Sequence, residues 1–207
     1  MDNSRISFIA QILLLVPVAF AQDASNQLSP ELIASQISQG RAAKDSFLVS
    51  ASESPFTEEM KKGFEGLQYF PVDLAFRIEA DLHIYGRPRR VPVTTNIESV
   101  IEMDRFGRLV GSWTGNPFSL EVFRNLQDGS ILVLFKDATN GSETYSAGRY
   151  VRVEDVGSGR YLIDFNNSYN PYCAYNTDYV CPMPPLENTL SFAVPAGEMD
   201  IGANLAY

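Results

Sequence analysis

Residues 76–85 alternate strictly between apolar and polar side chains, and this pattern limits the fold more than any other. The apolar series is Phe76, Ile78, Ala80, Leu82 and Ile84, and the intervening series is Arg77, Glu79, Asp81, His83 and Tyr85. Because successive side chains of a β-strand point to opposite faces, the pattern predicts a strand with one buried face and one solvated face.

The same alternation returns in shorter segments that are separated by turn-forming residues. Further strands are expected within residues 91–101, 109–113, 118–122, 131–135, 150–153, 161–165 and 190–194. Glycine-containing turns are expected at residues 86–89, 106–107, 127–129 and 157–159. With no helices between them, about eight such strands predict an antiparallel meander that forms a small barrel or a two-sheet sandwich.

Helices are expected only near the N-terminus, so the predicted fold class is mainly β with short N-terminal helices. Ser-Pro-Glu at residues 29–31 is a strong helix start, with a capping serine and proline in the first turn. The apolar spacing extends to about residue 50, as one helix or as two short ones because Gly40 interrupts it. A second short helix is expected over residues 57–62, ended by Gly63.

The first residues predict a cleavable export signal. Arg5 supplies a positive charge, residues 6–20 are mostly apolar, and Ala-Phe-Ala at residues 19–21 fits the small-x-small cleavage pattern. A membrane anchor is the alternative, but the uninterrupted apolar stretch is shorter than the ~20 residues that span a bilayer. We therefore expect residues 1–21 to be a signal peptide and the mature protein to be periplasmic or secreted, with no stable membrane insertion.

Cleavage would leave 186 of the 207 residues, the size of one domain with a sizeable core. Residues 22–27 are expected to be a disordered lead-in, and residues 28–207 a single compact β domain. The net charge of −9 argues against nucleic acid as a partner. From Asp164 onward the chain has five acids and no Lys or Arg, which fits a solubilising surface or, alternatively, a cation site or a basic partner.

His83 is the only histidine in the sequence. A single histidine excludes His-rich zinc sites and the two-histidine metalloprotease motif. The sequence also has no nucleophile elbow, phosphate loop or EF-hand loop. Since His83 lies on the polar face of its strand, we expect it to be a solvated surface residue. Catalytic residues remain unassigned, and no metal or cofactor is expected.

Two polar segments, residues 135–150 and 164–188, each begin at the end of a predicted strand. The second holds four tyrosines within eleven residues, among amide and carboxylate side chains. Rigid aromatic rings with polar tips suit the recognition of a sugar-like or other small polar ligand. The same side chains would also serve to cap the sheet and bond loop backbone. The candidate ligand-binding residues are Glu143, Tyr145, Arg149, Asp164, Asn166, Tyr169, Asn170, Tyr175, Glu187 and Asn188.

Arg149 is in phase with Val151 and Val153, on the apolar face of its predicted strand. A guanidinium on that face needs a carboxylate or an anionic ligand, because an unpaired buried charge is costly. Asp164 and Glu143 are the expected partners. The pattern leaves open a structural ion pair and an anion-binding role.

Several segments together resemble the bacterial family known as domain of unknown function 1684 (DUF1684). The resemblance is sharpest in the two polar segments and in Ala-Gly-Glu at residues 196–198, and residues 69–73 are similar to that family's entry to its first strand. It covers most of the mature chain. It implies one fold unit in which the two polar segments are important, and it implies no reaction.

Cys173 and Cys181 are the only cysteines, and in an exported protein they predict a disulfide. Seven residues separate them, enough for the loop to turn back on itself. Two free buried thiols are one alternative. A metal site completed by Asp178 or Glu187 is the other.

Three function classes remain open after these observations. The leading hypothesis is a noncatalytic domain that binds a small polar, sugar-like or anionic ligand at one end of the sheet. The second is a hydrolase that divides acid and base roles between two carboxylates from Glu143, Asp164, Glu187 and Glu198. The third is a structural or interaction protein of the cell envelope.

Overall fold

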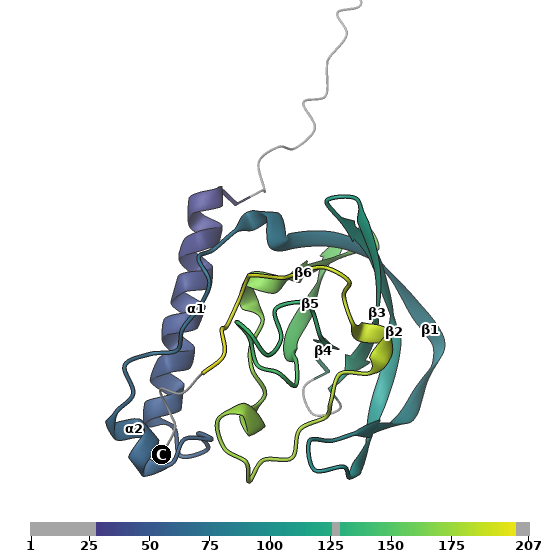
Figure 1. Ribbon diagram of the computed structural model, residues 1–207. Coiled ribbons are helices and arrows are strands. Elements are labelled where there is room, and N and C mark those ends of the chain that lie inside the picture. The colour runs from purple at the N-terminus through teal and green to yellow at the C-terminus, as the bar shows by residue number, and fades with distance from the viewer. Residues whose placement is uncertain (1–27, 126–128, 202–207) are drawn as a thin grey trace, which may run out of the picture.

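A computed structural model describes residues 28–125 and 129–201 and shows a barrel flanked by a long helix (Figure 1). In these residues six strands form a closed barrel: β1 (Arg77–Thr94), β2 (Val100–Trp113), β3 (Asn116–Arg124), β4 (Ile131–Phe135), β5 (Arg149–Gly157) and β6 (Arg160–Asp164). Each strand pairs antiparallel with the next, and β6 pairs back with β1. The predicted meander is confirmed, and it closes as a barrel.

The helices lie where the capping signals place them. Helix α1 (Pro30–Ser50) begins after Ser29, whose hydroxyl accepts a hydrogen bond from the Leu32 amide. It passes through Gly40 without a break, since one exposed glycine costs only about 1 kcal/mol in a helix. Helix α2 (Glu58–Lys62) is capped by Thr57 and ends at Gly63, as predicted. No helix in the described part of the chain is both long and apolar enough to cross a bilayer.

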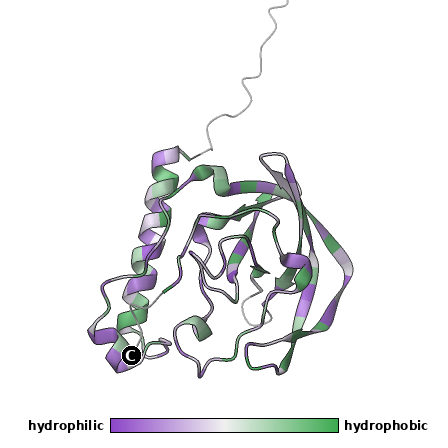
Figure 2. Cartoon of the chain, in the orientation of Figure 1, coloured by the Kyte–Doolittle hydropathy of each residue, from purple (hydrophilic) through white to green (hydrophobic). Residues whose placement is uncertain are grey.

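Short 3-10 turns connect these elements: η1 (Leu74–Phe76), η2 (Phe165–Asn167), η3 (Tyr172–Ala174) and η4 (Leu186–Asn188). The core lies inside the barrel, where Ile78 and Ala80 of β1 meet side chains such as Leu120, Val133 and Val151. Ile84, the last member of the predicted apolar series, is exposed instead. Hydrophobic and hydrophilic residues alternate along the long strands in Figure 2. The predicted signal peptide and the lead-in, residues 1–27, lie outside the described residues.

Several local expectations differ from the structure. The strand expected within residues 91–101 is divided, because β1 ends at Thr94 and β2 begins at Val100. Residues 86–89 are not a turn, because β1 continues through them as a bulge between the pairs Ile84–Gly107 and Arg89–Arg105. Residues 106–107 likewise lie within β2. A glycine in a strand often marks such a bulge or a close approach of backbones. A side chain at Gly107 would lie 2.7 Å from the carbonyl oxygen of His83.

Residues 190–194 form no strand, although Leu190 and Val194 are buried in the barrel core. The segment that contains them instead completes a weak seam of the barrel. In the described residues β3 and β4 pair at two positions, Phe123–Leu132 and Arg124–Ile131. Beyond these positions the two strands are bridged by the polar side chain of Asn188.

Asn188 replaces a missing part of the ladder. Its Oδ1 accepts a hydrogen bond from the Glu121 amide at 2.6 Å. Its Nδ2 donates to the carbonyl oxygens of Glu121 at 2.9 Å and Leu134 at 2.7 Å. The backbone of β4 continues the contact, because the Lys136 amide donates to the Asn188 carbonyl at 2.9 Å. The predicted ligand residue Asn188 therefore has a structural role at the seam.

Candidate functional site

A cleft of about 800 Å³ lies between α1 and the barrel. Figure 1 shows α1 beside the barrel, with loops between them. Residues of α1, of β4 and β5, and of the loop after β6 line the cleft. The lining residues used below are Arg41, Lys44, Tyr69, Asp164, Asn166, Ser168, Tyr169, Tyr172, Tyr179 and Cys181.

Arg41 and Lys44 lie three residues apart on α1, which places them on the same side of the helix. The Arg41 guanidinium donates to the carbonyl oxygens of Phe70 at 2.9 Å and Asn166 at 3.1 Å. It also lies over the Tyr69 ring, 4.6 Å from the centroid. Burial lowers the pKa of Arg41. Its acceptors among the described residues are backbone carbonyls, so its charge is not neutralised by a directly bonded carboxylate.

Lys44 anchors α1 to a buried carboxylate beneath the cleft. Its Nζ lies 2.5 Å from Glu198 Oε2 and donates to the Tyr175 hydroxyl at 2.9 Å. Tyr175 in turn donates to Glu198, and burial together with Glu198 raises the pKa of this tyrosine. Asn170 donates to Glu198 Oε1 at 2.8 Å through its side chain and to Oε2 at 3.2 Å through its amide. The predicted residues Asn170 and Tyr175 are thus joined with Glu198 in one network.

Asp164 and Asn166 fix the turn that starts the loop after β6. Asp164 accepts hydrogen bonds from Arg77 and from the amide and side chain of Asn166. Asn166 also accepts from the Asp73 amide at 2.9 Å and donates to the Asp73 carbonyl at 2.8 Å. These contacts orient the wall of the cleft, but they also use most of the hydrogen-bonding capacity of both side chains.

Three buried polar atoms of the lining residues have no hydrogen-bond partner within the part of the chain that the structure describes. They are the Tyr69 hydroxyl, Ser168 Oγ and Arg41 Nε. Asn170 Oδ1, in the network below, is a fourth such atom. Arg149 Nε, outside the cleft, is a fifth. Most buried polar atoms in native proteins are bonded, so the three unbonded atoms beside the cleft are candidates for hydrogen bonds to a bound molecule.

Arg149 is buried, as predicted, but the expected acid partner was wrong. Its Nη2 lies 2.9 Å from Asp137 Oδ2, and the guanidinium also donates to the carbonyls of Val194, Ala196 and Glu198. Burial lowers the pKa of Arg149, and Asp137 opposes the shift. Asp137 follows β4 by two residues, and Phe135 pairs with Arg149 across the ladder. This register places Asp137 next to Arg149, and the sequence pattern alone did not determine it.

The two acids that were expected to pair with Arg149 lie elsewhere. Glu143 is exposed, and Asp164 is held by Arg77. Arg149 does not line the cleft; it fastens residues 194–198 to the barrel. Its contacts are those of a structural ion pair.

The structure brings together part of the predicted site. Asp164, Asn166 and Tyr169 line the cleft, with Asn170 and Tyr175 below them. Glu143 and Glu187 are exposed and lie outside the cleft, so the four acids of the hydrolase hypothesis do not share one wall. Sequence reasoning missed Arg41, Lys44 and Tyr69. The spacing on α1 was the available signal, but no pattern linked that helix to residues more than a hundred positions away.

Cys173 and Cys181 are both buried and are free thiols in this structure. The Cys173 amide donates to Cys181 Sγ at 3.2 Å. A hydrogen bond from the Cys173 thiol lowers the pKa of Cys181 to about 7, and the same bond raises the pKa of Cys173. Burial and the nearby Cys173 raise the pKa of Tyr145 to about 12, so this predicted site residue lies beside the cysteines. The predicted disulfide remains a prediction.

A comparison with models of protein families shows which family the chain belongs to. Residues 62–199 match the model of the family described as protein of unknown function (DUF1684). The chain belongs to this family. The predicted resemblance is therefore confirmed. The match begins after α1, so Arg41 and Lys44 lie outside the part of this DUF1684 protein that the model covers.

A solved structure is similar over most of the chain. It is the solution NMR structure of the uncharacterised protein from gene locus rrnAC0354 of Haloarcula marismortui, at 32% identity and a TM-score of 0.65. The similarity covers 82% of this chain and 95% of that chain. A comparison with the curated proteins found no match.

Proposed function

We propose that this protein is an exported binding domain whose cleft takes a small ligand with a sugar or aromatic ring and an acidic group. The observation that carries the proposal is the cleft of about 800 Å³, whose lining joins the Arg41 guanidinium to several tyrosine rings. A ligand group that reached the buried, unbonded atoms of Tyr69, Ser168 and Arg41 beside it would also recover free energy lost when they were buried.

The chemistry of the walls selects the ligand class. Tyr172 and Tyr179 pack edge to face with ring centroids 5.4 Å apart, and Tyr169 also lines the cleft. Such rings contact the flat face of a sugar or an aromatic ring. Arg41 supplies a positive charge without a directly bonded carboxylate among the described residues, which favours an acidic group on the ligand. A uronic acid or an aromatic carboxylate has both features.

The location outside the cytoplasm is part of the proposal and rests on the sequence pattern of residues 1–21. N-terminal sequencing of the exported protein tests it. The mature chain is expected to begin at Gln22. An intact N-terminus on a cytoplasmic species would contradict the assignment.

A thermal-shift screen of residues 22–207 tests the binding function. The panel contains uronic acids, aromatic carboxylates and the matching neutral sugars and aromatic alcohols. A ligand that binds only the folded state stabilises it by about 2.7 kcal/mol at a hundred times its Kd. We expect acidic members to raise the Tm more than their neutral counterparts.

The double variant Tyr69→Phe/Ser168→Ala tests the place of binding. It removes two unbonded hydroxyls and should weaken binding of the best acidic hit by about tenfold or more. Tyr161→Phe/Ser119→Ala is the matched control, because it makes the same chemical changes outside the cleft. Equal effects of the two double variants, or no stabilising compound in the panel, would contradict the proposal.

A further inference from the structure

A second hollow, of about 980 Å³, lies on the outer face of β1 and β2. Its residues are His83, Tyr85, Gly86, Arg87, Arg89, Arg105, Arg108 and Val110. The bulge in β1 shapes it, since residues 85–88 lie opposite Phe106 alone in the register of the two strands. Bulges commonly occur where a strand redirects its side chains next to a site.

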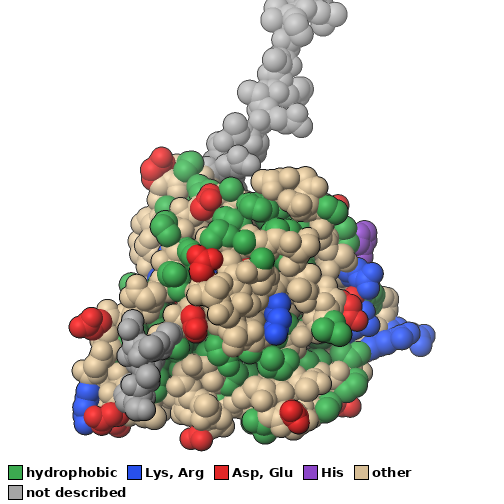
Figure 3. All heavy atoms as spheres, viewed as in Figure 1, with side chains coloured by type: hydrophobic (Ala, Val, Ile, Leu, Met, Phe, Trp, Pro, Cys, Tyr) green, Lys and Arg blue, Asp and Glu red, His purple; other side chains and the backbone are tan. Residues whose placement is uncertain are grey.

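Positive charge gathers in this hollow although the chain as a whole is acidic. Four arginines line the hollow, and one carboxylate, that of Glu121, bonds two of them, so these five side chains carry a net charge of +3 on a chain whose net charge is −9. In Figure 3 blue side chains and the purple side chain of the single histidine lie at the edge of the molecule where β1 runs in Figure 1. A concentration of charge of this kind attracts anions.

Glu121 holds two of the arginines in place from beneath. Its side chain is 5% exposed. Arg105 Nε donates to it at 2.6 Å, and Arg108 donates through Nε at 3.0 Å and Nη2 at 2.8 Å. The Tyr85 hydroxyl also donates to this carboxylate and accepts from Arg105 Nη2 at 3.4 Å. Each guanidinium has five N–H groups, so both keep donors that this network does not use.

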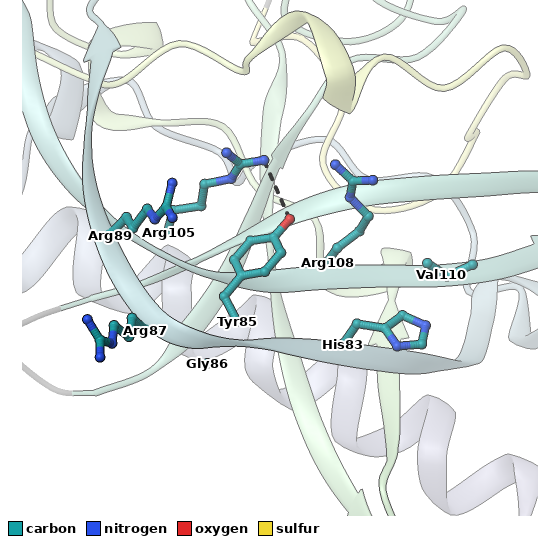
Figure 4. A pocket seen from close by; sticks show the side chains of 8 residues that line it. All are labelled: His83, Tyr85, Gly86, Arg87, Arg89, Arg105, Arg108 and Val110. Atoms are coloured by element: carbon teal, nitrogen blue, oxygen red, sulfur yellow. Dashed lines mark hydrogen bonds between the residues drawn. The ribbon is translucent and has the colours of Figure 1, made fainter.

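Arg87 and Arg89 complete the site from the bulge. Both are exposed, and neither forms an ion pair with an acid in the described residues. Figure 4 shows Arg89 and Arg105 on one side of Tyr85, Arg108 and His83 on the other, and Arg87 beyond the bulge. The hollow thus holds the guanidiniums of Arg105 and Arg108, which Glu121 fixes in place. Beside them lie those of Arg87 and Arg89, which form no ion pair with an acid in the described residues.

We propose that this hollow binds a soluble ligand with two or more linked phosphate groups. Guanidinium groups bind phosphate through paired hydrogen bonds in a geometry that fits their planar fork. A single phosphate carries at most about two charges, whereas linked phosphates carry about three or more and so match the net charge of the hollow. Four of the eight lining residues are arginines and the hollow is open, which suits charged phosphate groups better than an apolar ring.

Calorimetric titration with sodium tripolyphosphate at low salt tests the proposal, with orthophosphate as the single-phosphate comparison. The wild type should bind tripolyphosphate at least about tenfold more tightly than orthophosphate. Arg87→Ala/Arg89→Ala should weaken tripolyphosphate binding by about tenfold or more. Arg90→Ala/Arg160→Ala removes the same charge from exposed positions outside the hollow and should change it by less than about twofold.

The following outcomes would contradict the proposal. Absence of tripolyphosphate binding, or equal losses in the two double variants, would show that the hollow is not a site. Tighter binding of a sulfated oligosaccharide, or binding to phosphatidylglycerol vesicles without binding to tripolyphosphate, would overturn the assignment to soluble linked phosphates. The cleft variant Tyr69→Phe/Ser168→Ala should bind tripolyphosphate like the wild type, so failure of the cleft proposal leaves this result unchanged.

Discussion

Arg149 and Arg41 both place a guanidinium against backbone carbonyls, yet their surroundings differ. Arg149 contacts the carboxylate of Asp137 and three carbonyls, and its side chain has no exposed surface. Arg41 contacts two carbonyls, stacks on Tyr69 and faces a cleft. The first arginine has its counter-charge inside the protein, and the second lacks one in direct contact among the described residues. Charge compensation therefore distinguishes the two arginines, and the one without a bonded carboxylate lies in the cleft where we propose that a ligand binds.

The largest expected effect is at Arg149. Arg149→Met would leave Asp137 buried without its cation and should lower the free energy of unfolding by about 3–5 kcal/mol. Arg41→Met should cost about 1–2 kcal/mol, because it removes two hydrogen bonds to carbonyls and strands no buried acid. Urea denaturation measures both. A cost at Arg149 no larger than the cost at Arg41 would contradict the comparison.

Asn188 extends the comparison to a neutral side chain, whose amide oxygen and nitrogen both form hydrogen bonds inside the protein. Asn188→Ala would leave the Glu121 amide and the carbonyls of Glu121 and Leu134 without partners, and should cost about 3 kcal/mol. Asn176→Ala is a milder control, since that side chain is only half buried. Urea denaturation again gives the values. Equal, small losses at the two asparagines would mean that the seam does not depend on Asn188.

The cysteines test whether the loop beside the cleft is fixed covalently. A disulfide between Cys173 and Cys181 closes a nine-residue loop and should add about 2.5 kcal/mol to stability by the chain-entropy relation. Thiol titration of the unreduced, denatured exported protein is expected to find no reactive thiol. Two reactive thiols per chain would show that the free pair in this structure is also the state in solution.

The smallest expected stability effects are in the cleft. Tyr69→Phe removes an unbonded hydroxyl and should change the free energy of unfolding by less than about 0.5 kcal/mol, or raise it slightly. Tyr150→Phe also changes a cleft tyrosine, but its hydroxyl donates to the Pro182 carbonyl, so it should cost about 1 kcal/mol. Thermal or urea denaturation compares them. A larger loss at Tyr69 than at Tyr150 would show that the Tyr69 hydroxyl has a partner in the folded protein.

The fold could be predicted from the sequence because its signals are local. Period-two alternation and glycine turns gave the antiparallel meander, and Ser29 and Thr57 marked the starts of both helices. The strand boundaries were less accurate. Gly86 and Gly107 fit a turn and a bulge equally well, and only pairing with the neighbouring strand distinguishes the two.

The candidate site was predicted only in part because its pairs are distant in sequence. Arg149 was placed inside the barrel by its phase with Val151, but its partner depends on the register between β4 and β5. The contact between Arg41 and Asn166 spans 125 positions. No local sequence pattern indicates such a contact. The wall of the cleft formed by the loop after β6 could therefore be predicted, and the wall formed by α1 could not.

The seam held by Asn188 sets the order in which a newly made chain can complete its fold. All six strands precede residues 186–190, so they are synthesised before the residues that bridge β3 and β4. Until those residues arrive, the facing edges of these strands present unpaired amides and carbonyls that a second chain can bond. A variant cut just before residue 186 would keep all six strands but lack the side chain that bridges β3 and β4, so it should aggregate more readily than the full chain.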